Sequence, residues 1–591
     1  MARLIIASTR IKKIKKLFYL SMNLIHEWGF RYFVTVAWFE LRRQKWKIFF
    51  PDAEIKISLE PRMPVNEIKD YQNFHQTNLT EKHELEIIEK KSDFKTKFTI
   101  LVNYSENNLE LVLNSIQKQV YTNYRIVLVS NDEQVKNNLS DNFQDVKVIS
   151  NISEFLKFFE DDYLCILDAN TAITEDALFK IFKFLNVNDN AEVIYTDNDF
   201  FEQKISSRVS PFFKPDWSPY LLRSMNYLGP LCIIKKAILK KANLDQISTI
   251  LPFYDIILRT TEISKNVMHI HIPIATIYEK SVDIEYYEEG KKIISDHLQR
   301  TKISGVVSQG ILSNTFRVKY NHKSKPLISI LIPTRNNKKT LMQCIKSLEK
   351  NNTYENWELI IIDNNSTRKK TKLYYESLPY KIVSYNDLFN FSKMNNFAVK
   401  HAKGELLLFL NDDTKIIDSD SLEEMVSICC QDNIGAVGAK LIHYDDTIQH
   451  AGMVFLDNGV GFHPFQRIAE KKGGYYNLIN SIRECSAVTG ACLLTKKKIF
   501  EEINQFDEKF DVYYGDSDMC LKIINAGYKI IYTPFAKLLH DGSHSIKKQS
   551  SIYFAVENHH TFISKWPHLK KGDPFYNTNL GWNYSLKSIK Q

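Results

Sequence analysis

The stretch from Leu406 to Thr414 reads LLLFLNDDT and constrains the fold of this chain more than any other. Its apolar run, Leu406 to Leu410, predicts a strand buried on both faces of a sheet. The strand would deliver Asp412 and Asp413 to the carboxyl edge of that sheet, where open α/β sheets hold ligands. Adjacent carboxylates repel each other unless a positive charge lies between them, and a divalent cation carrying a diphosphate would supply it. An acidic turn after a strand explains the same residues, because Asn and Asp are ordinary turn residues.

The length and the charge of the chain limit the class of protein to which it can belong. A chain of 591 residues is too long for one hydrophobic core, so we expect roughly two to four domains. An apolar content of 44% with 25% charged residues is typical of a folded soluble protein. Residues 1–50 hold eleven Lys and Arg against Glu27 and Glu40, which equals the whole net charge of +9. The remainder of the chain is therefore neutral, which argues against a nucleic-acid-binding body.

The basic segment 1–50 interleaves its charges with aromatic and aliphatic residues. None of its uncharged apolar runs approaches the roughly 18 residues that a membrane span needs. No small-residue cleavage site follows Leu17 to Ile25, which argues against a signal peptide. Two interpretations stay open: amphipathic helices on an anionic membrane surface, or a basic helical arm packed on the protein's own body.

Eight cysteines are spread through the chain without a CxxC pair or zinc-ligand spacing. Most of them lie in apolar runs. We interpret them as reduced core residues of a cytosolic protein.

Strands and helices alternate twice along the chain, which predicts two mostly parallel α/β sheets. The first region is expected to have strands at 98–102, 124–130, 163–168 and 192–195, with helices at 109–119 and 176–185. The second is expected to have strands at 327–333, 358–363, 381–385 and 406–410, with helices at 339–350 and 392–402. The two align at a lag of about 230 residues, which indicates a tandem duplication. The predicted divisions are an N-terminal segment with linker (1–95), a first domain (96–280), a linker (281–325) and a second domain with a C-terminal extension (326–591).

Polar residues follow three strands of the second region. They are Pro333, Thr334 and Asn336 after the first, Asp363 after the second, and Asn411, Asp412 and Asp413 after the third. Parallel strands end at one edge, so we expect these groups in one crevice. Asp363 could accept from a base N–H or a ribose hydroxyl, and Asp413 could coordinate a metal that bridges two phosphates.

Three further features lie beyond these strands. Val488 to Leu493 is a strand of small residues that permits a close approach. Asp516 and Asp518 are two apart at a helix start and so have different roles; Asp516 is either an N-cap or a general base directed into the crevice. A lone histidine is usually structural, but on the same edge as a carboxylate-bound cation His540 is a candidate third metal ligand.

The ordered motifs LISILIPTRNN, ELIIIDNNS, NFSKMNNFAVKHAKGELLLFLNDDT, TIQHAGMVF, SAVTGACLLTKK and FDEKFDVYYGDSDMCLKIINAGYKIIYTPFAKLLH resemble the family 2 glycosyltransferases. The resemblance covers about residues 326–550 and is nearest to the rhamnosyltransferase-like branch of bacterial surface-polysaccharide synthesis. It implies the GT-A fold, a nucleotide-diphosphate sugar donor, Mg²⁺ or Mn²⁺, and inversion at the anomeric carbon. IYTDNDFFEQ and SPFFKPDWSPYLLRSMNYLG extend it to about residues 98–280, as in two-domain members. The expected fold is thus two tandem Rossmann-like GT-A domains after a helical basic segment.

The resemblance assigns roles residue by residue. It places the nucleotide at Pro333, Thr334, Asn336, Asp363 and Asp412, the metal at Asp413 and His540, and the catalytic base at Asp516. Asn411 replaces the first acid of the family's metal motif, and Gly515 replaces the Glu or Asn often found before the base. Possible donor or acceptor contacts are Asn395, Asn411, Gln449, His450, Gly490 and Asp518; Gly452 belongs to the same branch-specific element as Gln449 and His450.

The first region departs from the family at each comparable point. Asn103 replaces the strand-one Pro, Asp168-Ala169-Asn170 replaces the metal motif, Phe253 stands at the base and Tyr278 at the terminal His. A shift of two residues in this alignment would restore Asp255. These losses predict a catalytically inactive domain kept for packing, acceptor binding or assembly.

The expected function is transfer of a sugar to a growing surface glycan, such as O-antigen or capsule, on an acceptor that is lipid-linked. The expected location is cytoplasmic, peripheral on the inner face of the membrane through residues 1–50, with no nucleic-acid partner. Two alternatives stay open: a bifunctional polymerase with both domains active, and a non-catalytic scaffold that binds nucleotide sugars.

Overall fold

The computed structural model describes residues 65–78, 94–104, 108–131, 135, 139, 143, 145–248, 250–278, 284–313, 315–322, 324–540, 542 and 552–587. The predictions for the basic segment 1–50 lie outside these residues. Within the predicted linker 51–95, helix α2 spans Val65–Asn78. In the part of the chain that the structure describes, no helix is both long enough and apolar enough to span a membrane.

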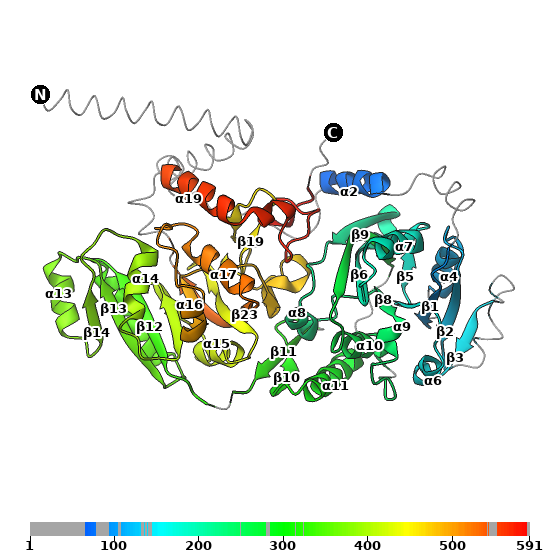
Figure 1. Ribbon diagram of the computed structural model, residues 1–591, viewed down its shortest axis with the longest axis horizontal. Helices are drawn as coiled ribbons and strands as arrows, with labels where there is room; N and C mark the ends of the chain where they lie inside the picture. The colour runs from blue at the N-terminus through cyan, green and yellow to red at the C-terminus, as the bar shows by residue number, and fades with distance from the viewer. Residues whose placement is uncertain are drawn as a thin grey trace, which may run out of the picture. The chain divides into compact units, whose positions relative to one another are not determined.

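The sheet of the second region has strand order β14-β13-β12-β15-β22-β17-β23-β16, with β18 beside β17 and β21 beside β23. Figure 1 labels β14, β13 and β12 at one end of this sheet and β23 nearer the other. Its strands are β12 (Ile328–Thr334), β13 (Trp357–Asp363), β14 (Lys381–Ser384), β15 (Leu406–Leu410), β16 (Thr414–Ile416), β17 (Ile434–Ile442), β18 (Ile448–His450), β21 (Arg483–Glu484), β22 (Cys492–Lys496) and β23 (Lys529–His540). All five residues of β15 are buried, as the apolar run predicts. A separate hairpin joins β19 (Val454–Phe455) and β20 (Gly461–Phe462).

This sheet is mixed, so the expectation of a mostly parallel sheet is corrected. Strands β14, β13, β12 and β15 are parallel neighbours. Strand β22 then runs antiparallel between β15 and β17, and β16 is antiparallel to β23. The physical reason is that β22 is inserted from far along the chain, which a run of alternating strands and helices does not reveal. The half of the sheet that precedes it keeps the parallel arrangement.

Helices pack on both strand-rich regions. In the second they are α12 (Lys338–Lys350), α13 (Lys369–Glu376), α14 (Phe391–Val399), α15 (Ser421–Cys429), α16 (Lys497–Glu502), α17 (Gly515–Asn525) and α19 (Ile552–Lys565), with 3₁₀ turns η3 (Tyr475–Asn480), η4 (Pro567–Lys571) and η5 (Trp582–Tyr584). Helix α14 contacts β12 and β13, and α17 contacts β17 and β23. The start of α14 is set by Asn390, whose side chain accepts a hydrogen bond from the Lys393 N–H.

The sheet of the first region has strand order β3-β2-β1-β4-β8-β6-β9-β5, with β7 beside β6. Its strands are β1 (Phe98–Asn103), β2 (Tyr124–Val129), β3 (Lys147–Ile149), β4 (Tyr163–Leu167), β5 (Thr171–Ile173), β6 (Val193–Glu202), β7 (Ser207–Phe212), β8 (Leu231–Lys235) and β9 (Val267–Ile277). Its helices are α4 (Leu109–Gln117), α6 (Ile152–Lys157), α7 (Ala177–Val187), α8 (Pro219–Ser224), α9 (Lys236–Leu239) and α10 (Pro252–Thr261), with the 3₁₀ turn η2 (Gln203–Ile205). The two sheets have the same strand order when β1, β2, β3, β4, β5, β6, β8 and β9 are taken as the counterparts of β12, β13, β14, β15, β16, β17, β22 and β23.

The segment predicted as the linker 281–325 has regular structure over much of its length. It contains α11 (Ile284–Arg300) and a hairpin of β10 (Gly305–Gln309) and β11 (Phe316–Tyr320). Helix α11 contacts α10, and β11 contacts α8 and α15. Gly290 permits the hairpin to approach α11, since a Cβ at this position would lie 2.3 Å from the Phe316 ring.

All eight cysteines are free, and Cys430 is the one of them that is not fully buried. This agrees with their interpretation as reduced residues. Burial raises the pKa of the Cys165, Cys232 and Cys344 thiols, so these groups stay protonated and act as small apolar side chains.

Candidate functional site

Three strand ends meet at one edge of the second sheet. Strand β12 pairs in parallel with β13 on one side and with β15 on the other. In this register Thr334 lies opposite Asp363, and Leu331 lies opposite Phe409. The prediction that these three strands share an edge is confirmed, and their polar residues are therefore neighbours.

The Asp412 carboxylate joins the end of β15 to the end of β12. Its Oδ2 accepts hydrogen bonds from Thr334 Oγ1 at 2.6 Å and from Asn337 Nδ2 at 3.1 Å. Asp412 is buried, with 8% of its surface exposed, so these bonds fix its orientation. Sequence reasoning missed Asn337; its place directly after Asn336 in the TRNN motif was the available signal.

Asp413 and His540 form the second part of this edge. Strand β16 pairs with β23 so that Thr414 lies opposite His540. This register brings His540 Nε2 to 3.2 Å from Asp413 Oδ1 and to 3.4 Å from Asn411 Nδ2. The other ring nitrogen, Nδ1, is buried and has no hydrogen-bond partner among the described residues. A carboxylate oxygen and an imidazole nitrogen this close are a donor set that fits Mn²⁺, so the two residues suit the expected ion.

Two tight turns follow β12 and β13. Asn336 has a left-handed backbone (φ 57°), and its Oδ1 accepts from the Thr367 and Arg368 N–H groups, both at 2.9 Å. The Asp363 Oδ1 accepts from the Ser366 N–H at 3.1 Å. Ser366 Oγ in turn accepts from the Asn336 N–H at 2.9 Å, so the two turns are one hydrogen-bonded unit. Pro333 and Asp363 remain partly exposed beside it.

Asp516 is connected to the residue after β15 by the turn that precedes β22. Its Oδ2 accepts from the Gly490 N–H at 2.9 Å, and its Oδ1 accepts from the Ser517 N–H at 2.8 Å. The next residue, Ala491, accepts through its carbonyl from the Asn411 N–H at 3.1 Å. The base candidate and the metal motif are thus connected through one backbone segment. Burial raises the pKa of Asp516, whereas these hydrogen bonds lower it. The net shift is upward, and it makes the carboxylate more basic.

Gly490 is required at this point for a second reason. A Cβ here would lie 2.8 Å from the Phe391 ring and 3.6 Å from the Asp516 Cβ. Strand β22 begins at Cys492, so Gly490 lies in the turn before it and not in the strand predicted for Val488 to Leu493. The small residue in this turn leaves room for Phe391 of α14 and Asp516 of α17 to lie close to the backbone. Tyr514, in the left-handed region at φ 66°, turns the chain into α17.

The remaining candidate contacts have internal partners. Asp518 is fully buried and accepts from Trp566 Nε1 at 2.9 Å, with Lys565 Nζ at 2.8 Å. His450 is also buried, with its Nδ1 2.8 Å from His463 Nδ1. These contacts give both residues a packing role in addition to any ligand role.

Asn395 and Gln449 each hold a buried side-chain oxygen with no hydrogen-bond partner among the described residues. Asn395 donates through Nδ2 to the Phe391 carbonyl at 2.9 Å. Gln449 Nε2 lies near Gly542, where a Cβ would be 3.7 Å away. Gln449 therefore belongs to the surroundings of His540.

Comparison with known proteins decides the family of this region. Residues 329–503 match the family model described as "Glycosyl transferase family 2". This part of the chain is a family 2 glycosyltransferase domain. It has a GT-A-like mixed α/β sheet. The match contains the strand ends around Asp363 and Asp413, whereas Asp516 and His540 lie beyond its last residue.

Two relatives are 30% identical to this chain over 71% of its length. They are an uncharacterized protein, y4gI, of Sinorhizobium fredii, 48% of which is covered, and the O-antigen biosynthesis protein RfbC of Myxococcus xanthus, 34% of which is covered. The chain thus spans less than half the length of either. The O-antigen chain rhamnosyltransferase RfbN of Salmonella typhimurium is 24% identical over 40% of this chain and 74% of its own. A mannosyltransferase of Pyrobaculum calidifontis, solved with GDP-Man and Mn²⁺, aligns with a TM-score of 0.30 at 18% identity over 42% of this chain and 68% of its own.

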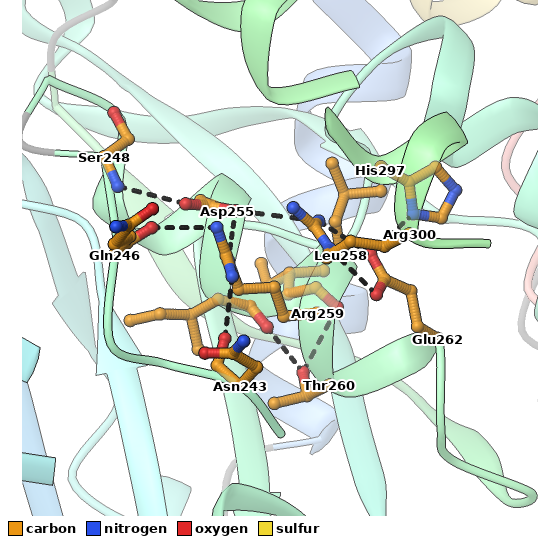
Figure 2. Close-up of polar contacts among 12 residues, drawn as sticks. Asn243, Gln246, Ser248, Asp255, Leu258, Arg259, Thr260, Glu262, His297 and Arg300 are labelled. Carbon is orange, nitrogen blue, oxygen red and sulfur yellow. Dashed lines mark hydrogen bonds and ion pairs between the residues drawn. The ribbon is translucent and has the colours of Figure 1, made fainter. Parts of the chain in front are cut away.

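Helix α10 directly precedes β9 in the chain, as α17 directly precedes β23, and these two strands hold the same place in the two sheet orders. The second residue of α17 is Asp516, and the second residue of α10 is Phe253, which is buried. Asp255 follows two residues later but is enclosed by ion pairs (Figure 2). Its Oδ1 lies 2.7 Å from Arg259 Nε, and its Oδ2 accepts from the Ser248 N–H at 3.0 Å.

The ion pairs around α10 continue into α11. Arg259 also donates to the Asn243 and Gln246 carbonyls, and Arg300 binds both oxygens of Glu262 (Figure 2). His297 Nδ1 lies 2.8 Å from Glu262 Oε1. The network holds α10 against α11, so the Asp255 carboxylate is a structural charge.

The first sheet has other residues at the positions that correspond to Asp413 and His540. Strand β5 pairs with β9 so that Thr171 lies opposite Ile277, where the second sheet has Thr414 opposite His540. The register therefore places Ile277, rather than Tyr278, at the histidine position. Asn170 Oδ1 accepts from Asn108 Nδ2 at 3.1 Å. Asp168 lies near the buried Lys214, and burial raises the pKa of its carboxyl to about 6.

Proposed function

We propose that this protein is an inverting, metal-dependent glycosyltransferase that moves a sugar from a nucleotide-diphosphate donor to a growing bacterial surface glycan. The observation that carries the proposal is the connection between Asp516 and the NDD motif through Gly490 and Ala491. A base and a diphosphate site must be adjacent to act on one donor sugar. The relatives named for O-antigen synthesis and rhamnosyl transfer support the same chemistry.

The donor nucleotide is proposed to lie against the two joined turns after β12 and β13. Asp363, partly exposed at this edge, would accept from the base or the ribose, and Asn336 keeps the facing turn in shape. Asp412, held by Thr334 and Asn337, would contact the ribose of the nucleotide or the metal ion. Asp413 and His540 would hold the Mg²⁺ or Mn²⁺ ion, which supplies positive charge to the leaving diphosphate.

Asp516 is proposed as the general base. Its Oδ2 is fixed by the Gly490 N–H, and its raised pKa brings its basicity nearer to the working pH. It takes the proton of an acceptor sugar hydroxyl as that oxygen attacks the anomeric carbon from the face opposite the diphosphate. The C1–O bond to the diphosphate breaks, and the configuration at C1 is inverted.

The first sheet is proposed to be a second GT-A-like domain, at 96–280, that has lost catalysis. Its strand order repeats that of the family 2 domain. Phe253 cannot accept a proton, and Asp255 is committed to Arg259. This favours one active site over the bifunctional alternative.

The acceptor is proposed to be a lipid-linked glycan, and the enzyme to work at the cytoplasmic face of the membrane. The support is the concentration of the chain's net positive charge in residues 1–50, which favours an anionic lipid surface. Sedimentation with vesicles of anionic and of neutral lipid would test this: binding to both equally, or to neither, would contradict it.

The proposal as a whole is tested with the full chain and a panel of nucleotide-diphosphate sugars in Mn²⁺ or Mg²⁺. Calorimetry should show binding of one donor class, and mass spectrometry should show a glycan longer by one sugar. Donor binding without transfer to any glycan would favour the scaffold alternative. Transfer of two different sugars, with one of them surviving Asp413→Ala, would favour the bifunctional alternative.

A further inference from the structure

A group of metal-ligand side chains lies in the first sheet, apart from the candidate glycosyltransferase site. His269 and His271 are two apart on β9 and so project from the same face of the strand. Asp216 lies in the loop between β7 and α8. Its Oδ1 is 3.1 Å from His269 Nδ1 and 3.0 Å from His271 Nε2, and the three donor atoms all lie within 4.8 Å of one another.

The spacing of these atoms is that of a coordination site. Ligand atoms about 2.0 Å from a tetrahedral zinc ion are roughly 3.3 Å apart, which small side-chain adjustments would reach from 3.0 and 3.1 Å. The two imidazole rings are tilted by 30° with their centroids 4.1 Å apart, and both direct a nitrogen at the same carboxylate oxygen. The opposite nitrogen of His271, Nδ1, is buried and has no hydrogen-bond partner among the described residues. Within the described part of the chain, Asp216 is therefore the polar side chain that orients this ring, which also lies against the His269 ring.

Outer partners hold the ligands in place. His269 Nε2 lies 2.8 Å from Asp197 Oδ1, the carboxylate–histidine arrangement that supports metal-bound imidazoles. Asp197 is fully buried and accepts from Asn577 Nδ2 and from the Lys214 N–H. His269 is thus fixed on its outer side by a satisfied carboxylate.

The C-terminal segment reaches this cluster as well. The Asp216 N–H donates to the Pro574 carbonyl at 2.7 Å, and Asn579 Nδ2 donates to the His271 carbonyl at 2.8 Å. Residues more than 300 positions apart in sequence therefore meet around the three ligands. A cation here would join β9 to the loop before α8, and both of these are hydrogen-bonded to the segment 573–579.

We propose that Asp216, His269 and His271 bind a zinc-class transition-metal ion that fastens the C-terminal segment to the first sheet. Two imidazoles and one carboxylate are the ligand types that zinc takes, whereas Mg²⁺ prefers oxygen ligands. The side chains of Asp216 and His271 are 37% and 33% exposed, which leaves an approach for the ion and room for a water as fourth ligand. The site is independent of the proposed transferase chemistry.

The test uses the full chain, treated with chelator and then titrated with Zn²⁺ or Co²⁺. We expect one ion per chain beyond any bound at the transferase site, with the visible absorption of tetrahedral Co²⁺. His271→Ala should weaken this binding by roughly 100-fold or more, and Asp197→Asn by about 10- to 100-fold. Asp413→Ala, which alters the transferase site, and His568→Ala, which removes an exposed histidine, should leave it unchanged.

Two further measurements keep the result decisive. Zn²⁺ should raise the midpoint of thermal unfolding of the wild type and of His568→Ala, but not of His271→Ala. Zn²⁺ should also slow proteolytic cleavage within residues 573–587. Circular dichroism establishes that His271→Ala is folded; if it is not, Asp216→Asn replaces it. An Asp413→Ala chain that binds no Zn²⁺ or Co²⁺, or a His271→Ala chain that binds as the wild type does, would show a hydrogen-bond network only and overturn the proposal.

Discussion

The Asp516 carboxylate accepts a hydrogen bond from the Gly490 N–H at 2.9 Å. Gly490 precedes Ala491, whose carbonyl accepts from the N–H of Asn411 at the start of the NDD motif. Asn411 after β15, the turn before β22 and Asp516 in α17 are therefore held within a few bonds of one another, although Asn411 and Asp516 are more than 100 positions apart in sequence. A backbone link of this kind would fix the distance between the proposed base and the proposed diphosphate site, which a displacement reaction requires.

Replacing Asp516 tests its role as base. Asp516→Asn keeps an acceptor for the Gly490 N–H, so the fold and donor binding should persist. Transfer should fall by about 10²- to 10⁴-fold, the usual contribution of a positioned general base. Calorimetry measures donor affinity, and product formation measures kcat. Asp432→Asn, at an exposed carboxylate, is the matched control. Near-normal transfer by Asp516→Asn would remove Asp516 from the mechanism.

The ion site is tested at Asp413 and His540. Their donor atoms lie 3.2 Å apart, so loss of either leaves an incomplete ligand set. Asp413→Ala and His540→Ala should each weaken Mn²⁺-dependent donor binding by at least about 10-fold, with the larger loss for Asp413 because its charge is also removed. A Mn²⁺ titration monitored by donor binding gives the comparison. If both variants respond to Mn²⁺ as the wild type does, the ion is held elsewhere.

The network around α10 is expected to stabilise the fold and not to act in transfer. Asp255 is 3% exposed, so Arg259→Met would leave a buried charge without its nearest partner and lower the free energy of unfolding by about 3–5 kcal/mol. Arg300 lies 3.9 Å from Asp255 and is 23% exposed, so Arg300→Met should cost less. Denaturant unfolding measures both. Transfer per folded molecule should be unchanged in each variant, and a selective loss of transfer would instead assign the network to catalysis.

The His450–His463 pair predicts a specific pH dependence of stability. Burial lowers the pKa of His463 to about 4 and that of His450 well below its ordinary value. Below about pH 6.5 the unfolded chain takes up protons that the folded pair does not, so the free energy of unfolding should fall as the pH drops toward 4. Above that range neither state gains protons and the effect vanishes.

His463→Gln isolates this effect because it removes one titrating ring and keeps a polar side chain near His450. Between pH 7 and 4.5 its stability should fall less steeply than that of the wild type, by up to about 3 kcal/mol over the range. Urea unfolding in chelator, at several pH values, gives the two slopes. His568→Gln should follow the wild type, and equal slopes for His463→Gln would show that the pair titrates normally.

Much of the fold was accessible from the sequence, since it depends on local patterns. The apolar run of β15 coincides with the observed strand, because five consecutive apolar residues suit a strand covered on both faces. The shared edge of β12, β13 and β15 followed from parallel pairing of neighbours. The antiparallel insertion of β22 did not follow, since it depends on a pairing across more than 80 residues. The helix and hairpin within 281–325 were missed for a similar reason: their stability comes from packing on α10 and α8.

The sequence by itself determined the residue types available for chemistry: the acids after β13 and β15, the acid at the start of α17 and the histidine at the end of β23. Only the tertiary structure decided which of them are partners. It paired Asp413 with His540 through a strand register, attached Asp516 to Gly490, and enclosed Asp255 between arginines. It also gathered Asp216, His269 and His271, which no spacing in the sequence connects. The physical reason is that local pattern fixes which face a side chain occupies, while contacts between distant segments depend on how whole elements pack.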